Sequence, residues 1–157
     1  MKIIDITKNN LLQYKNVILD QLDPLEWGGS KMLVKKIKHN NLLESEHIVL
    51  FIDDSNRRGF LIGHGALLQE DIVKDTDVSP FVSAIFVSHD YRGKGYSLKI
   101  ANQIEEVALL DGYRELYIVT KHEGLYEKIG YKQIGTKKNI SGEYMRILKK
   151  RVFVKSD

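Results

Sequence analysis

A glycine-containing turn with two basic residues is the part of this sequence best suited to bind a ligand. It lies between a strand-like run that ends at Val87 and a helix-like segment. The first N–H groups of a helix lack an acceptor within the helix, and the helix dipole adds about half a positive charge there. Glycine allows close approach of the backbone, and basic side chains add full charges. The turn consists of Arg92, Gly93, Lys94, Gly95, Tyr96 and Ser97. The pattern predicts a phosphate or pyrophosphate site; the other interpretation is an ordinary loop with solvated basic side chains.

Two common nucleotide-binding patterns are absent from the sequence. A P-loop requires Gly-x4-Gly-Lys followed by Ser or Thr, and no such string occurs. A dinucleotide fingerprint requires a third glycine, but Leu98 follows Gly93-x-Gly95 at that place, and Leu68 follows Gly63-x-Gly65. The predicted anion site therefore belongs to neither of these nucleotide folds.

The elements that must position this turn follow the order β-α-α-β-β-β-α-β-α-β-β. Hydrophobic periodicity and turn residues predict strands at 2–6, 47–52, 60–69, 81–88, 115–120, 131–136 and 143–154, and helices at 9–23, 31–39, 95–111 and 123–129. Strands 81–88 and 115–120 are joined by a helix in a right-handed crossover and must be parallel, whereas residues 47–69 form an antiparallel hairpin. Ser30 is expected to cap the second helix, and Glu105 to face water on the third. The predicted fold class is α+β, in three layers, with a mostly antiparallel sheet.

Composition limits the protein to a few broad classes. A chain of 157 residues with 43% hydrophobic residues fits one domain, 1–157, with a real core. The net charge of +3 is too small to indicate nucleic acid or an anionic membrane as partner. There is no apolar run near the length of a membrane span and no visible signal peptide, so a cytoplasmic protein is expected. The absence of cysteine excludes disulfides and thiol catalysis, and the histidines show no metal-ligand spacing, so no metal is expected.

Two short motifs resemble the GCN5-related N-acetyltransferase (GNAT) family. The turn reads Arg92-x-x-Gly95-x-Ser97, which is similar to the family signature Gln/Arg-x-x-Gly-x-Gly/Ala, with serine in the last place. About thirty residues later, residues 124–131 read Gly-Leu-Tyr-Glu-Lys-Ile-Gly-Tyr, similar to the family's Tyr-Glu-Lys-x-Gly-Phe/Tyr element. The element order is also the family's order. The resemblance therefore covers nearly the whole chain.

The resemblance implies where a cosubstrate would bind. In this family, acetyl-CoA lies between the separated fourth and fifth strands, with its pyrophosphate on the turn. The strand residues that would pair with the pantetheine arm are Ile85, Phe86 and Val87. The backbone of residues 92–97 would hold the pyrophosphate. The strand separation also implies a strand N–H near the thioester carbonyl, which would stabilise the tetrahedral oxyanion.

The resemblance further implies direct attack of an amine on the thioester. Tyr126 would then protonate the departing thiolate; the other interpretation is a half-buried aromatic that packs its short helix. The base is open among His64, His122, Glu123 and a water relay, because the start of the fourth strand has no carboxylate. Trp27 either forms a wall of the acceptor site or fixes the first two helices against each other.

The function that follows is transfer of an acetyl group from acetyl-CoA to a primary amine of a small molecule, peptide or protein. The alternative is a GNAT-fold module that binds CoA without catalysis and acts as a sensor or partner-binding subunit. A nucleic-acid-binding domain is disfavoured because no such motif occurs and the charges are interspersed. No membrane partner is expected, and the exposed final strands are a candidate edge for homodimer formation.

Overall fold

The computed structural model describes residues 1–55, 59–73 and 76–154. Its elements are β1 (Lys2–Ile6), α1 (Leu11–Leu22), α2 (Gly28–Lys38), β2 (His47–Asp53), β3 (Phe60–Leu68), β4 (Phe81–Val87), the 3-10 helix η1 (His89–Tyr91), α3 (Tyr96–Leu110), β5 (Glu115–Thr120), the 3-10 helix η2 (Tyr126–Ile129), β6 (Lys132–Lys138) and β7 (Tyr144–Arg151). The predicted order is confirmed, but the fourth helix is a single 3-10 turn rather than a helix over 123–129. In the described ranges, no helix is long and apolar enough to cross a membrane.

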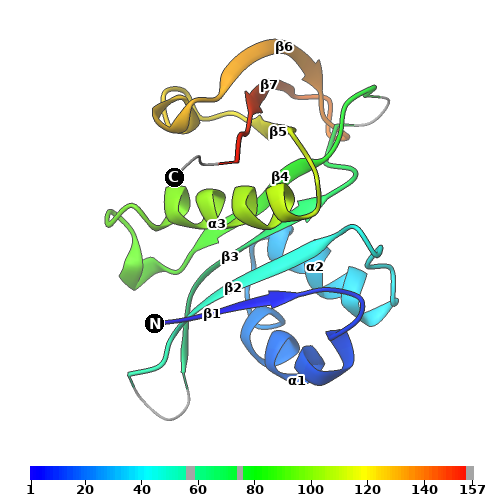
Figure 1. Cartoon of the computed structure of the whole chain (residues 1–157). Coiled ribbons are helices and arrows are strands. Elements are labelled where there is room, and N and C mark those ends of the chain that lie inside the picture. Colours follow the sequence, from blue (N-terminus) through cyan, green and yellow to red (C-terminus); the bar gives the residue numbers. More distant parts are fainter. Residues whose placement is uncertain (56–58, 74–75, 155–157) are drawn as a thin grey trace.

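Seven strands form one sheet in the order β1-β2-β3-β4-β5-β7-β6. All neighbours are antiparallel except β4 and β5, which are parallel as predicted. Helix α3 lies on one face of the sheet, and α1 and α2 lie on the other (Figure 1). The expected mixed, mostly antiparallel three-layer architecture is therefore confirmed.

Both faces of β2 are buried, which explains its uninterrupted apolar sequence. Val49 and Phe51 belong to the core under α3, whereas Ile48, Leu50 and Ile52 belong to the core under α1 and α2. Because alternate residues of a strand point to opposite faces, each face needs its own apolar set. The hairpin predicted over 47–69 is confirmed by antiparallel pairing of β2 with β3. The centre of its turn, residues 56–58, lies outside the described part of the chain.

Strands β4 and β5 touch at one point and then separate. Within these two strands, only Phe81 and Tyr117 lie opposite each other in register, beside a backbone bond of 3.1 Å from the Tyr117 N–H to the Pro80 carbonyl. On the other edge of β4, three steps from Ser83 to Phe86 oppose two steps on β3, so β4 contains one extra residue. Ala84 accommodates it with φ of 53°, a left-handed conformation that is uncommon for a non-glycine residue. The bulge lies where the two strands have diverged.

Two residues differ from their expected positions. Ser30 does not cap α2, because the helix already begins at Gly28; instead its buried hydroxyl lies 2.7 Å from Nε2 of His64. Glu105 does not face water; it is buried and pairs with Lys150 across to β7, and the Tyr131 hydroxyl donates to it at 3.5 Å. A partner on a distant strand compensates the burial of this charge, and helical periodicity cannot reveal such a partner.

Candidate functional site

Two pockets meet where β4 and β5 separate. The first, here called the turn pocket, has a volume of about 640 Å³ and lies between the end of β4 and the start of α3. The second, here called the strand pocket, has a volume of about 440 Å³ and lies between α2, β4 and β5. Four residues line both: Trp27, Ile85, His122 and Tyr126. The two pockets are therefore continuous around these side chains.

The turn pocket contains most of the residues predicted to bind an anion. Phe86, Val87, Arg92, Gly93, Gly95, Tyr96 and Ser97 line it together with Ile85, whereas Lys94 does not. Gly93 and Gly95 have φ of 76° and 81°, which favours glycine, and an added Cβ at either would meet no atom within 4 Å. The glycines thus provide the turn geometry and leave the backbone open to the pocket.

The N–H groups of this turn differ in their availability. The Arg92 N–H already donates to the His89 carbonyl at 3.3 Å, so the open N–H groups begin at Gly93, not at Arg92. The Arg92 Nε donates to the Val87 carbonyl at 3.0 Å, which ties the turn to the end of β4. The remaining guanidinium N–H groups are exposed and suited to an anion. Lys94 places its Nζ 5.8 Å from the Tyr91 ring centroid instead.

Tyr126 lies at the junction of the two pockets, at the start of η2. Its side chain is buried, with its ring edge-on to Tyr131 at a centroid distance of 6.3 Å. Burial raises the pKa of the Tyr126 phenol to about 12. The phenol is consequently protonated at all ordinary pH values and can act only as a proton donor there.

Arg146 of β7 holds the segment that carries Tyr126, a role that its place in a strand gave no reason to expect. Its guanidinium pairs with Glu127 at 2.8 Å, donates to the His122 carbonyl, and donates to the Gln133 side chain at 2.9 Å. The Arg146 guanidinium lowers the pKa of the Glu127 carboxyl, with help from the Gly124 N–H. These bonds fix the chain on both sides of Tyr126.

The three predicted base residues lie in different surroundings. His122 is exposed and lines both pockets, whereas Glu123 is exposed and lines neither. His64 is fully buried in the middle of β3 and also lines neither pocket, so it does not lie at the cleft, where a base for the amine would have to be. Burial lowers the pKa of His64 to about 4, which makes it a weak base. The structure brings only His122 of these three next to Tyr126.

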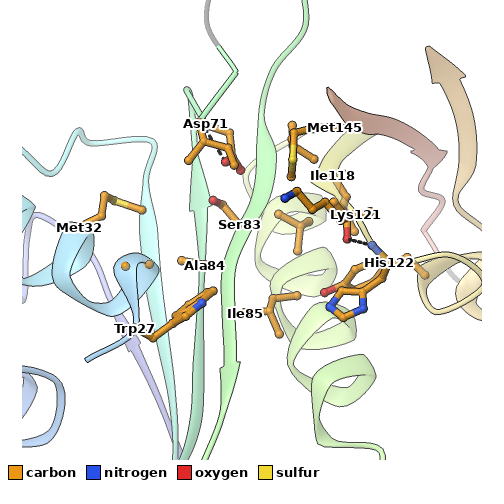
Figure 2. A pocket seen from close by; sticks show the side chains of 17 residues that line it. Trp27, Met32, Asp71, Ser83, Ala84, Ile85, Ile118, Lys121, His122 and Met145 are labelled. Carbon is orange, nitrogen blue, oxygen red and sulfur yellow. Dashed lines mark hydrogen bonds between the residues drawn. The ribbon is translucent and has the colours of Figure 1, made fainter. Parts of the chain in front are cut away.

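Asp71 is the site residue that sequence reasoning missed. It lies between β3 and β4 and lines the strand pocket, beside Ser83 (Figure 2). Burial raises the pKa of its carboxyl, and bonds from the Ser83 hydroxyl and the Ile72 N–H oppose this. One signal for it is present in the sequence, because Glu70 and Asp71 are two adjacent acids at the start of the loop into β4. Loop geometry decides which of them faces the pocket, and periodicity does not describe it.

Trp27 precedes α2 and lies over the sheet rather than between the first two helices. Its ring stacks on Phe86 at a centroid distance of 5.7 Å and lies 5.9 Å from the His64 ring. A Cβ at Gly29 would come within 2.3 Å of the Trp27 ring, so glycine at that position leaves space for the indole. With 42% of its surface exposed, the side chain forms part of the wall of both pockets.

Several solved structures that share this fold are acetyltransferases. The aminoglycoside 6'-N-acetyltransferase from Enterococcus faecium is 16% identical, with a TM-score of 0.67 and coverage of 100% of both chains. An aminoglycoside 6'-N-acetyltransferase complexed with coenzyme A is 16% identical, with a TM-score of 0.63 and the same coverage. An IAA acetyltransferase from Bacillus cereus is 18% identical, with a TM-score of 0.57 and coverage of 96% of this chain and 99% of that one. At these identities the likeness shows the fold.

The sequence itself identifies the family. No curated protein matches the chain significantly. The acetyltransferase (GNAT) family, however, matches over residues 17–131, which is well over half of the chain and includes both the turn and the Tyr126 segment. The chain therefore belongs to the GNAT acetyltransferase family.

Proposed function

We propose that this protein transfers an acetyl group from acetyl-CoA directly to a primary amine. The observation that carries this proposal is the junction of the two pockets at Ile85, His122 and Tyr126. A cosubstrate in the turn pocket and an amine in the strand pocket would meet there. Direct attack requires that both substrates be bound together with their reacting atoms in contact, and two connected pockets provide that arrangement.

Acetyl-CoA fits the turn pocket by charge and by backbone geometry. Its pyrophosphate would accept hydrogen bonds from the open N–H groups that begin at Gly93 and from the Arg92 guanidinium. Its pantetheine arm would lie along residues 85–87 of β4, on the edge that β5 leaves unpaired beyond Phe81. An N–H of that edge would stabilise the oxyanion formed when the amine attacks.

Tyr126 is the proposed general acid for the departing CoA thiolate. A phenol with a pKa of about 12 is a weak acid in water. A thiolate formed beside it in the same buried junction would be destabilised by the same loss of solvent, so its pKa would also rise. Proton transfer between the two groups would then be close to balance, which suits general acid catalysis.

Asp71 is the proposed proton acceptor for the attacking ammonium, through a water molecule. Among the described residues that line the strand pocket, Asp71 is the one with a carboxylate. Its raised pKa makes it a stronger base than an exposed carboxylate. His122 is the second candidate, because it lines both pockets. Asp71→Asn should lower kcat about 100-fold if Asp71 is the base, whereas His122→Gln should then leave kcat within about threefold.

Calorimetric titration with acetyl-CoA tests the cosubstrate site. Arg92→Glu should weaken binding at least about tenfold, which corresponds to about 1.4 kcal/mol. Lys8→Glu makes the same charge change at an exposed residue that lines neither pocket and should leave binding unchanged. Tyr126→Phe should bind acetyl-CoA normally but release thiol about 100-fold more slowly.

Two results would contradict the proposal. If the wild-type protein does not bind acetyl-CoA, the proposed acetyl transfer is wrong. If it binds acetyl-CoA but acetylates no amine, and Tyr126→Phe alters neither acetyl-CoA binding nor the rate of thiol release, the chain is a CoA-binding module without catalysis.

A further inference from the structure

We infer that the acceptor is a primary monoamine whose amine is attached to an apolar body, rather than a polycation. This inference rests on the proposed acetyl transfer, since it concerns the occupant of the strand pocket during that reaction. Two of the similar solved structures are named for aminoglycosides, which carry several amines. The acceptor inferred for this chain differs from those, and the inference comes from the side chains that line its strand pocket.

The walls of the strand pocket are mostly apolar. Trp27 and Met32 lie on the α2 side, and Met145 lies across from them on the β5 and β7 side (Figure 2). Val82 of β4 and Ile118 of β5 add further apolar lining. An indole and two thioethers offer polarizable surfaces that adapt to an apolar or aromatic group. The walls therefore favour an acceptor with an apolar body.

The pocket has one group that attracts an ammonium. Among the described residues that line it, Asp71 is the one that carries a carboxylate. The other titratable side chains in the lining are Lys121, His122 and Tyr126. The Lys121 ammonium pairs with Glu143 at the rim, so this pair adds no net charge. One carboxylate is sufficient for one amine.

Among the described residues that line the strand pocket, a polycation would find no second carboxylate for its further charges. Each additional ammonium would be removed from water beside apolar walls, where the paired Lys121 and Glu143 offer no net charge. Desolvation of an unpaired charge opposes binding. An apolar monoamine places its single charge at Asp71 and buries its body against Trp27 and Met32. The pocket consequently discriminates by charge number as well as by shape.

The first test compares four acceptors with the wild-type protein. Thiol release from acetyl-CoA is measured with 2-phenylethylamine, hexylamine, spermidine and kanamycin at pH 8 and 0.15 M salt. We expect kcat/KM at least about tenfold higher for the two monoamines than for either polycation. A higher kcat/KM for spermidine or kanamycin would overturn the inference.

A charge placed in the wall provides the second test. The Met32 side chain is partly exposed and lines the strand pocket but not the turn pocket, so its substitution leaves the turn pocket intact. Met32→Glu should lower kcat/KM for 2-phenylethylamine and raise it for spermidine at least about fivefold, because a second carboxylate now faces the second ammonium. Met32→Gln is the matched control and should not raise the rate with spermidine. An equal kcat/KM with spermidine for the Met32→Glu and Met32→Gln variants would overturn the inference.

Binding of acetyl-CoA separates failure of this inference from failure of the proposed function. If the wild-type protein binds acetyl-CoA and turns over a polycation but neither monoamine, or turns over none of the four amines, the inference is wrong. If it does not bind acetyl-CoA, the proposed function is wrong and the inference falls with it.

Discussion

The pH dependence of folding stability should depend on one histidine that connects three elements. Nδ1 of His47, at the start of β2, lies 2.8 Å from the Asp5 carboxylate of β1. Its Nε2 lies 2.6 Å from the Asp111 carboxylate just after α3. Both ring nitrogens can donate only when the imidazole is protonated. Together these two acids outweigh the opposing effect of burial, with the Asp5 bond the largest contribution, and raise the pKa of His47 from 6.5 to about 8.

The size of the effect follows from this shift. The difference between 6.5 and about 8, at about 1.4 kcal/mol for each pKa unit, gives a contribution of about 2 kcal/mol to the free energy of unfolding. Because the folded pKa is raised, the contribution is fully present below about pH 6.5 and is lost as the pH rises through about 8. His47→Gln should therefore cost about 2 kcal/mol at pH 6 and much less at pH 9.

Urea unfolding at pH 6, 7, 8 and 9 measures this difference. The free energy of unfolding of the wild type minus that of His47→Gln should fall by about 2 kcal/mol across the series. His39→Gln, which removes an exposed histidine at the end of α2, is the matched control. A difference for His47→Gln that stays constant from pH 6 to pH 9 would refute the reasoning.

Three further predictions test other parts of the structure. Gly95→Ala should lower the free energy of unfolding in urea by about 1–2 kcal/mol, because a φ of 81° strains the backbone of alanine. The added Cβ would meet no atom within 4 Å, so backbone strain is the whole effect. Arg146→Met should lower kcat about tenfold through displacement of the Tyr126 segment, while calorimetry should show unchanged acetyl-CoA affinity. Gly63→Ala places a Cβ 2.3 Å from the Phe86 carbonyl oxygen and should cost about 3 kcal/mol in urea, whereas Gly135→Ala, which meets no atom within 4 Å, should cost less than about 1 kcal/mol. Equal losses for these two glycine variants would show that close approach of β3 and β4 does not determine the effect.

Most of the fold follows from local patterns in the sequence. The run from His47 to Ile52 and the helical spacing after Gly95 are signals within single segments, and both elements form where expected. Ser30 and Glu105 could not be placed in this way, because their partners are His64 on β3 and Lys150 on β7. A partner on a distant strand leaves no periodic signal near the residue that it pairs with.

The candidate site divides in the same way. The turn could be predicted because glycines, basic residues and a helix start follow one another along the chain, and Tyr126 could be predicted from its motif. Asp71 and Arg146 could not be predicted. A loop brings Asp71 to the strand pocket, and strand pairing brings Arg146 beside Glu127. Residues that reach a site through tertiary structure carry no spacing rule relative to the residues they join.

The single point of pairing between β4 and β5 divides the sheet into two half-sheets. Strands β1–β4 form one continuous ladder and β5–β7 form another, and in backbone pairing only the Phe81–Tyr117 register joins them. The core under α3 contains residues of both halves and holds them together, but the facing edges of β4 and β5 lack backbone bonds beyond this register, which permits local separation of the two edges. A cosubstrate that pairs along β4 would restrict this separation. Amide hydrogens at the facing edges of β4 and β5 should therefore exchange more slowly when acetyl-CoA is bound, while those at the β1–β2 pairing keep their rates.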